Sequence, residues 1–140
     1  MYQATVAISQ EFDRANIKYQ LTDDQDEGYS YVEASFKSKA GTVVLVKYIS
    51  RDNDNDYAVR VFSLAHIPDE KIEDALKLIN AKNRKFRYVK FVLDDDGDVN
   101  MEYDLPMKGG NLGPCAVEMF IRFVKIIDEV LPEFMHLIWA

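Results

Sequence analysis

Hydrophobic residues recur along the chain at two different spacings, and each spacing predicts one kind of element. From Gln3 to Ile17 they return every three or four positions, which is the period of a helix with one apolar side. The polar stretch Thr22–Gly28 interrupts this pattern with residues typical of turns. We expect strands in the next three runs, which are rich in aromatic and β-branched residues: Tyr29–Lys37, Thr42–Ile49 and Tyr57–Leu64.

Short connections separate these three predicted strands. Antiparallel neighbours can be joined in this way, whereas a parallel pair needs a crossover of about a dozen residues or more. The middle strand, Thr42–Ile49, is apolar at nearly every position. That pattern predicts a central strand that is covered on both faces.

The second half of the chain predicts a helix, a hairpin and a closing helix. A helix begins near Pro68, and its apolar stripe is formed by Ile72, Ala75, Leu76 and Ile79. The hairpin joins Phe86–Leu93 to Val99–Leu105 through a turn that contains Asp96 and Gly97.

The closing helix opens near Gly113 and Pro114 and runs to Leu131. We expect Pro132 to end or kink it, and Glu133–Trp139 to form a short further helix. The order α-β-β-β-α-β-β-α predicts an α+β fold. Residues 1–140 are expected to form a single domain, in which helices pack on an antiparallel five-stranded sheet.

Composition narrows the class of protein. The chain has 17 basic and 24 acidic residues, a net charge of −7, and this acidity argues against nucleic acid or an anionic membrane as the main partner. Its single cysteine excludes a disulfide within the chain, which favours the reducing cytoplasm. The first residues do not form a signal peptide, and no apolar run approaches the roughly 20 residues of a membrane span.

Three segments in the second half resemble one family. They are Leu78–Arg84 (LINAKNR), Lys90–Val99 (KFVLDDDGDV) and Tyr103–Leu105 (YDL), and a long helix follows them. Together with the element order they are similar to the YbjN-like family, described as bacterial sensory-transduction regulators. This resemblance implies a fold similar to that of type III secretion chaperones, which bind extended protein segments and are commonly dimeric. It supplies no catalytic residue.

The acidic turn around Gly97 invites comparison with a calcium loop. With Gly97 at position 6 of an EF-hand, Val92 would occupy position 1 and Tyr103 position 12, where oxygen ligands are required. We therefore interpret the turn as a solvated hairpin connection. The same interpretation applies to the acidic stretch at residues 52–56, and we predict no metal site and no cofactor.

Cys115 stands near the start of the closing helix, where a thiol could become reactive. A nucleophilic cysteine needs a base, and the only histidines, His66 and His136, lie far from it in the sequence. Three Cys and His residues are also too few for a structural zinc site. We predict a structural cysteine and no catalytic residue.

Basic residues gather in one stretch of this acidic chain. Its candidate partner-binding members are Lys82, Arg84, Lys85 and Arg87. We interpret them as a patch for an acidic protein partner or as a solvated face, in preference to nucleic-acid binding.

Two functions remain open at this stage. The first is a non-catalytic protein-binding or regulatory module, chaperone-like and homodimeric, which docks a protein segment on its sheet and helix surface. Its candidate self-association or partner contacts are Ile72, Leu76, Ile79, Phe134, Leu137 and Trp139. The alternative is an enzyme or small-ligand domain with a pocket between sheet and closing helix. A deep pocket with convergent polar groups of perturbed pKa would favour the alternative.

Overall fold

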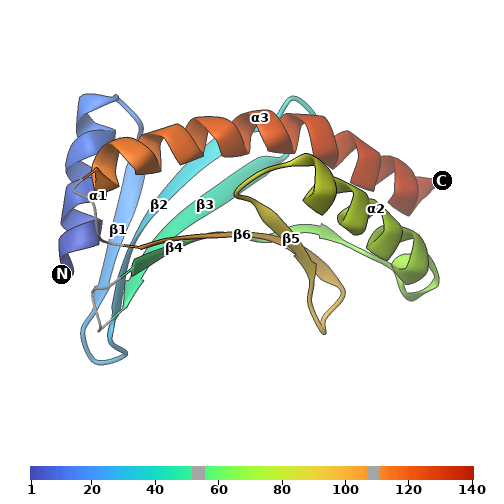
Figure 1. Ribbon diagram of the computed structural model, residues 1–140, viewed down its shortest axis with the longest axis horizontal. Coiled ribbons are helices and arrows are strands. Elements are labelled where there is room, and N and C mark those ends of the chain that lie inside the picture. The colour runs from blue at the N-terminus through green and yellow to red at the C-terminus, as the bar shows by residue number, and fades with distance from the viewer. Residues whose placement is uncertain (52–55, 107–110) are drawn as a thin grey trace.

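The computed structural model describes residues 1–51, 56–106 and 111–140. Asp52 and Asp54, which belong to the acidic stretch interpreted as a turn, lie outside these ranges. The elements are α1 (Gln3–Arg14), β1 (Tyr19–Asp24), β2 (Tyr29–Lys37), β3 (Val43–Arg51), β4 (Asp56–His66), a 3-10 turn (Asp69–Lys71), α2 (Ile72–Lys85), β5 (Lys90–Leu93), β6 (Asp98–Pro106) and α3 (Leu112–Trp139) (Figure 1). The prediction of an α+β fold with an antiparallel sheet is confirmed.

The sheet has six strands, so the prediction of five is wrong. All neighbours are antiparallel, in the order β1-β2-β3-β4-β6-β5. The additional strand is β1, which pairs with β2 from Tyr19 opposite Ala34 to Asp24 opposite Tyr29. The sequence predicted a turn here because β1 is rich in polar residues. These residues are polar because β1 lies at the sheet edge, where several of its side chains face water. The predicted turn shrinks to four residues and ends at Gly28, whose φ of 74° suits glycine.

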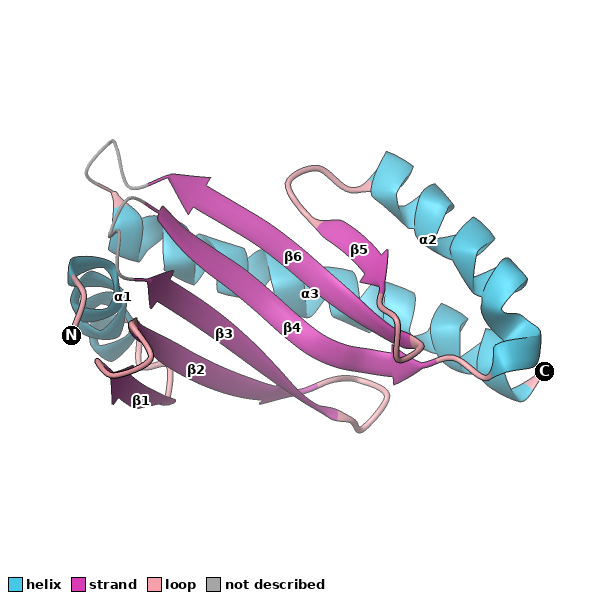
Figure 2. Cartoon of the chain, turned by 90° about the horizontal axis from the view of Figure 1, so that it is seen from below, coloured by secondary structure: helices cyan, strands magenta, loops and turns pink. Residues whose placement is uncertain are grey.

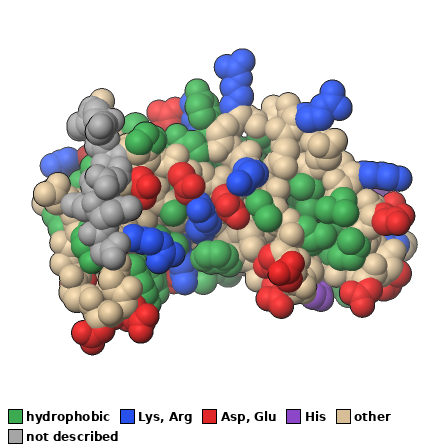
Figure 3. Space-filling model, turned by 60° about the horizontal axis from the view of Figure 1, so that its bottom comes forward, with side chains coloured by type: hydrophobic (Ala, Val, Ile, Leu, Met, Phe, Trp, Pro, Cys, Tyr) green, Lys and Arg blue, Asp and Glu red, His purple; other side chains and the backbone are tan. Residues whose placement is uncertain are grey.

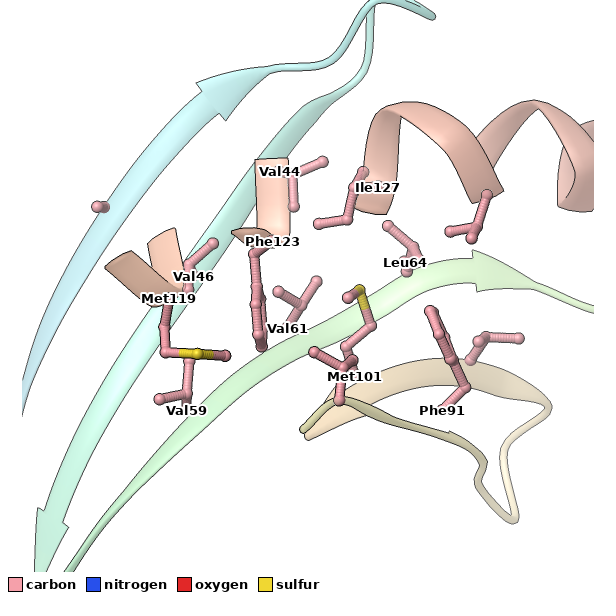
Figure 4. Packing of buried hydrophobic residues seen from close by; sticks show 14 of the residues in the cluster. Val44, Val46, Val59, Val61, Leu64, Phe91, Met101, Met119, Phe123 and Ile127 are labelled. Atoms are coloured by element: carbon pink, nitrogen blue, oxygen red, sulfur yellow. The ribbon is translucent and has the colours of Figure 1, made fainter. Parts of the chain in front are cut away.

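The helices cover one face of the sheet. Helix α3 crosses above the strands, and α1 packs against its first half (Figure 1). In the core between them, Phe123 and Ile127 of α3 meet Val44, Val46 and Val61 of the sheet (Figure 4). Helix α2 lies beside β5, at the other edge of the sheet from β1 (Figure 2).

Because the helices lie on one side, the prediction that the central strand is covered on both faces is wrong. Val44, Val46 and Tyr48 of β3 are buried beneath the helices. On the opposite face, Val43 is 65% exposed and Leu45 is 46% exposed. The apolar run therefore predicted a strand correctly, but Val43 and Leu45 lie on a face that no helix covers.

Helix α3 continues through Pro132 to Trp139, so the predicted break and separate short helix are wrong. Val130, Leu131 and Phe134 are fully buried on either side of the proline. Their packing holds the helix together although Pro132 cannot donate a backbone hydrogen bond. The consequence is a single helix that spans the molecule and packs on α1 near one end and on α2 near the other.

Candidate functional site

Strand β6 extends beyond its outer neighbour. The two strands pair from Lys90 opposite Glu102 to Leu93 opposite Val99, although the sequence predicted a partner strand from Phe86 onward. The chain joins the sheet late because the left-handed backbone of Tyr88, with φ of 71°, interrupts the extended conformation of a strand just before Lys90. Among the described residues, no strand pairs with the outer side of Tyr103–Pro106 (Figure 2). We call this outer side the β6 edge.

The direction of the backbone groups at the β6 edge follows from Asn83. Its side-chain Oδ1 accepts the N–H of Phe91 at 2.6 Å, and its Nδ2 donates to the carbonyl of Phe91 at 3.0 Å. Phe91 therefore points its backbone groups away from β6, and Lys90 points its groups toward Glu102. Because this direction alternates along an antiparallel strand, the N–H and C=O of Asp104 point outward at the β6 edge.

An apolar groove of about 250 Å³ adjoins the β6 edge. We call it the edge groove, and its lining residues come from the loop before β5, from β6 and from α3: Tyr88, Tyr103, Leu105, Cys115, Glu118, Met119 and Arg122. The rings of Tyr88 and Tyr103 meet edge to face at 6.1 Å. The guanidinium of Arg122 lies over the Tyr88 ring at 5.7 Å, so an aromatic wall and a cation border the groove.

Two titratable groups of the edge groove, Tyr103 and Arg122, have pKa values that are raised further from neutrality. Burial raises the pKa of Tyr103, which strengthens its preference for the neutral phenol. The hydrogen bond that Arg122 donates to Glu118, at 2.8 Å, raises the pKa of the guanidinium further. Both shifts move away from neutrality, whereas a general acid or base needs a pKa near the working pH. Neither Tyr103 nor Arg122 therefore has a pKa suited to proton transfer near neutral pH.

The size of the edge groove also favours a protein segment over a metabolite. Sites for drug-sized ligands usually occupy about 300–1,000 Å³, whereas 250 Å³ suits one large side chain. A larger depression of about 600 Å³ lies between α1 and α3. Its walls are open to solvent, since Ile121 is half-exposed and Glu118 and Arg122 reach into water.

The open face of the sheet carries a row of charges beside exposed apolar side chains that include Val43, Leu45 and Phe62. Cross-strand neighbours place five charged residues on one line from β2 to β5: Glu33, Lys47, Arg60, Glu102 and Lys90. The row is held by ion pairs of 3.6 Å between Glu33 and Lys47, 3.9 Å between Arg60 and Glu102 and 3.8 Å between Lys90 and Glu102. Acidic and basic side chains are accordingly interleaved on this side of the molecule (Figure 3). Burying such ions costs several kcal/mol each, so the charge row favours a solvated face.

The six predicted contact residues fall into three environments. Ile79 and Phe134 are buried in the core, which removes them from any surface that a partner could reach. Ile72 and Leu137 are half-buried against the core. Leu76 is 49% exposed and Trp139 is 82% exposed, so these two remain as candidate contacts.

The predicted basic patch is divided in the same way. Lys82 is buried and pairs with Glu133, and Lys85 pairs with Glu129 at 2.6 Å. Both lysines form ion pairs that join α2 to α3, and they are therefore less available to a partner. Arg84 and Arg87 are exposed, and neither has an ion-pair partner among the residues that the structure describes.

The acidic turn uses its carboxylates for local hydrogen bonds. Asp94 accepts the backbone N–H groups of Asp96 and Asp98 and the side-chain amide of Asn100, at 2.9–3.0 Å. Asp98 in turn contacts His66 at 2.9 Å. Within residues 1–51, 56–106 and 111–140, no group of three or more His, Cys, Asp or Glu residues is arranged to hold a metal ion.

Cys115 lines the edge groove, and neither histidine is among the lining residues. Sequence reasoning did not identify the β6 edge or the role of Tyr88. The residue types around Tyr88 do not indicate that its backbone is left-handed, and so they predicted a strand that would cover the edge. The one available signal was the basic and aromatic stretch around Tyr88, which interrupts the alternation expected of a strand.

The comparisons with known proteins agree on one family. Residues 6–134 match the YbjN family model, described as "Putative bacterial sensory transduction regulator". A solved structure, titled "Crystal structure of YbjN, a putative transcription regulator from E. coli", is 16% identical, has a TM-score of 0.58 and aligns over 89% of each chain, which shows a shared fold. No curated protein matches the chain. In the described ranges, no helix is long and apolar enough to cross a membrane. Since the family model spans most of its length, this chain belongs to the YbjN family.

Proposed function

We propose that this protein is a non-catalytic regulatory module that binds an extended protein segment by strand addition at the β6 edge. The observation that carries the proposal is the outward-facing backbone of Asp104, which has no strand partner among the described residues and lies beside the edge groove. The family's description as a regulator supports a role in signalling rather than in catalysis. A single cysteine fits action in the reducing cytoplasm.

In this mechanism the segment takes the place that β5 leaves empty before Lys90. Its backbone exchanges hydrogen bonds with Asp104, and alternate side chains point toward the helices or toward the open face. A side chain on the helix side would enter the edge groove between Tyr103 and Met119. The backbone provides affinity in such complexes, and the groove provides selection of the sequence.

The apolar exposure of Leu76 and Trp139 supports the further proposal of a homodimer. Helix α2 begins beside the C-terminus, where Lys71 donates to the carbonyl of Ala140 at 2.9 Å (Figure 1). Leu76 lies in the second turn of α2, and Trp139 is the last residue of α3. This end is separate from the β6 edge, so self-association and segment binding need not compete.

The test uses peptides selected from a random phage library on the immobilised protein. We expect Asp104→Pro to weaken the selected peptides about tenfold, because the outward N–H is lost and the proline ring blocks the edge. Asp104→Ala is the matched control, since it loses the same ion pair with Arg60 and keeps the N–H. Affinities are measured by fluorescence anisotropy, and circular dichroism checks that both variants are folded.

Equal binding by Asp104→Pro and Asp104→Ala would overturn the proposal. So would selection of peptides that shift amide NMR signals away from Tyr103–Pro106 and the edge groove. Failure to select any peptide would count against the proposed function as well, unless the β6 edge is shown to pair with a second copy of the chain.

A further inference from the structure

The edge groove is lined by side chains that favour an aromatic occupant. Tyr88 and Tyr103 present ring edges and faces, and Cys115 and Met119 supply polarisable sulfur. Leu105 contributes an aliphatic wall. Aromatic rings gain from edge-to-face and sulfur contacts beyond the burial of their area, and these contacts are unavailable to an aliphatic side chain of the same size.

Tyr88 offers this surface at a conformational cost. It is 60% exposed and has a left-handed backbone, a conformation that residues other than glycine rarely adopt. Its ring is positioned by Arg122 on one side and by Tyr103 on the other. A strained, exposed aromatic residue at the mouth of a groove is more typical of a binding surface than of a structural loop.

The surroundings of the edge groove are locally basic, although the protein carries a net charge of −7. Arg87 precedes Tyr88 in the bordering loop, and Lys125 lies one turn beyond Arg122 on α3. In the part of the chain that the structure describes, neither Arg87 nor Lys125 has an ion-pair partner, while Arg122 is paired with Glu118. The elements that border the groove therefore carry two basic residues that are unpaired among the described residues, Arg87 and Lys125, whereas the acidic lining residue Glu118 is already paired with Arg122.

We infer that the segment bound at the β6 edge is acidic and anchors itself by one aromatic side chain in the edge groove. Its carboxylates meet Arg87, Arg122 and Lys125 while its ring packs between Tyr88 and Met119. This inference rests on the proposed function, because it specifies the chemistry of the same occupant.

The sequences selected in the phage experiment test this chemistry directly. We expect the peptides that depend on Asp104 to share an aromatic residue with glutamate or aspartate within two or three positions. Replacing the aromatic residue by alanine should weaken a selected peptide about tenfold or more, as expected for a buried ring. Replacing each acidic residue by its amide should weaken it about twofold to fivefold, with a smaller effect at high salt.

Charge variants of the protein provide the matched comparison. Arg87→Gln and Lys125→Gln should each reduce the difference between the acidic peptide and its amide form. Arg84→Gln, which removes another exposed arginine, in the last turn of α2, should leave that difference unchanged.

The outcomes separate the two proposals. Peptides that are lost in Asp104→Pro but are neutral, basic or free of aromatic residues would overturn the inference and leave strand addition intact. Peptides that bind Asp104→Pro normally would overturn the proposed function itself. An equal effect of Arg84→Gln and Arg87→Gln would show that only the overall charge of the protein matters.

Discussion

At the scale of single residues, Asn83 satisfies the outward-facing backbone groups of the edge strand β5. Its carboxamide makes the two hydrogen bonds that a neighbouring strand would make with Phe91. The amide thus blocks the outer side of β5 from strand addition, while Asp104 remains open farther along. Asn83 belongs to the segment that resembles the YbjN family, and the structure supplies a physical role for it.

We expect Asn83→Ala to lower the free energy of unfolding by about 1–3 kcal/mol, because both backbone groups of Phe91 lose their partner in a half-buried position. Urea unfolding followed by circular dichroism measures the change. The control is Asn80→Ala on an exposed position of the same helix. If both variants lose the same stability, the loss reflects the helix alone and the edge role of Asn83 is wrong.

A second residue-scale prediction concerns acid stability. The hydrogen bond from the backbone N–H of Asp98 is the main cause that lowers the pKa of Asp94, aided by the amide of Asn100 and the N–H of Asp96. A lowered pKa in the folded state means that the ionised carboxylate stabilises the fold above the pKa of the unfolded chain, near 3.8. This contribution is lost as the pH falls below about 4 and passes through the lowered pKa.

We therefore expect Asp94→Asn to be less stable than the natural protein near neutral pH and to lose less of its stability between about pH 5 and pH 3. Urea unfolding at a series of pH values measures both effects. Asp95→Asn, one position along the same turn, should keep the pH dependence of the natural protein. Identical pH dependence in both variants would contradict the role assigned to Asp94.

At the scale of elements, the sequence predicts helices and strands correctly where the spacing of apolar residues reflects burial of one side of the element. The period of α1 and the strand β2 follow from apolar spacing, since each has one side against the core. The patterns mislead where tertiary contacts decide. Polar β1 forms a strand because β2 offers it hydrogen bonds, and β5 begins only at Lys90 because the left-handed backbone of Tyr88 precedes it.

The candidate site escaped prediction for the same reason. The predicted strand Phe86–Leu93 would have covered the β6 edge, so the site exists only because half of that strand does not form. The basic residues were identified from composition, but their pairing with Glu129 and Glu133 depends on the path of α3. The spacing of apolar residues indicates which side chains are buried. It does not indicate which strand edge remains without a partner.

Pro132 gives an element-scale prediction, because it interrupts the hydrogen bonds of α3 without ending the helix. We expect Pro132→Ala to raise the free energy of unfolding by about 1–3 kcal/mol, since a helix-interior proline costs about 3 kcal/mol. Thermal and urea unfolding measure the gain. Pro114→Ala is the control in the first turn of α3, where proline is tolerated and no comparable gain is expected. A loss of stability in Pro132→Ala would show that the packing of Phe134 requires the proline.

At the scale of the whole molecule, surfaces of different character are distributed around one core. The open sheet face carries the charge row and favours water, while the β6 edge offers backbone hydrogen bonds beside an apolar groove. The far end of α2 and α3 exposes Leu76 and Trp139. If both proposals hold, the contacts for a bound segment and those for a second copy lie on different parts of the surface.

The last prediction concerns self-association at the end that bears Leu76 and Trp139. If a homodimer forms there, Trp139→Ser should weaken it by about tenfold or more, because the most exposed large apolar side chain would lose its buried contact. Leu76→Ser should act in the same direction with a smaller effect. Sedimentation velocity over a range of concentrations measures the dimer.

Val43→Ser is the matched control for this experiment, since it removes an apolar side chain that is 65% exposed on the open sheet face. A dimer weakened equally by Val43→Ser would place the interface on the sheet. A natural protein that remains monomeric at high micromolar concentration would remove the homodimer proposal altogether. Segment binding at the β6 edge would then be carried by the monomer, since none of its contacts requires a second copy.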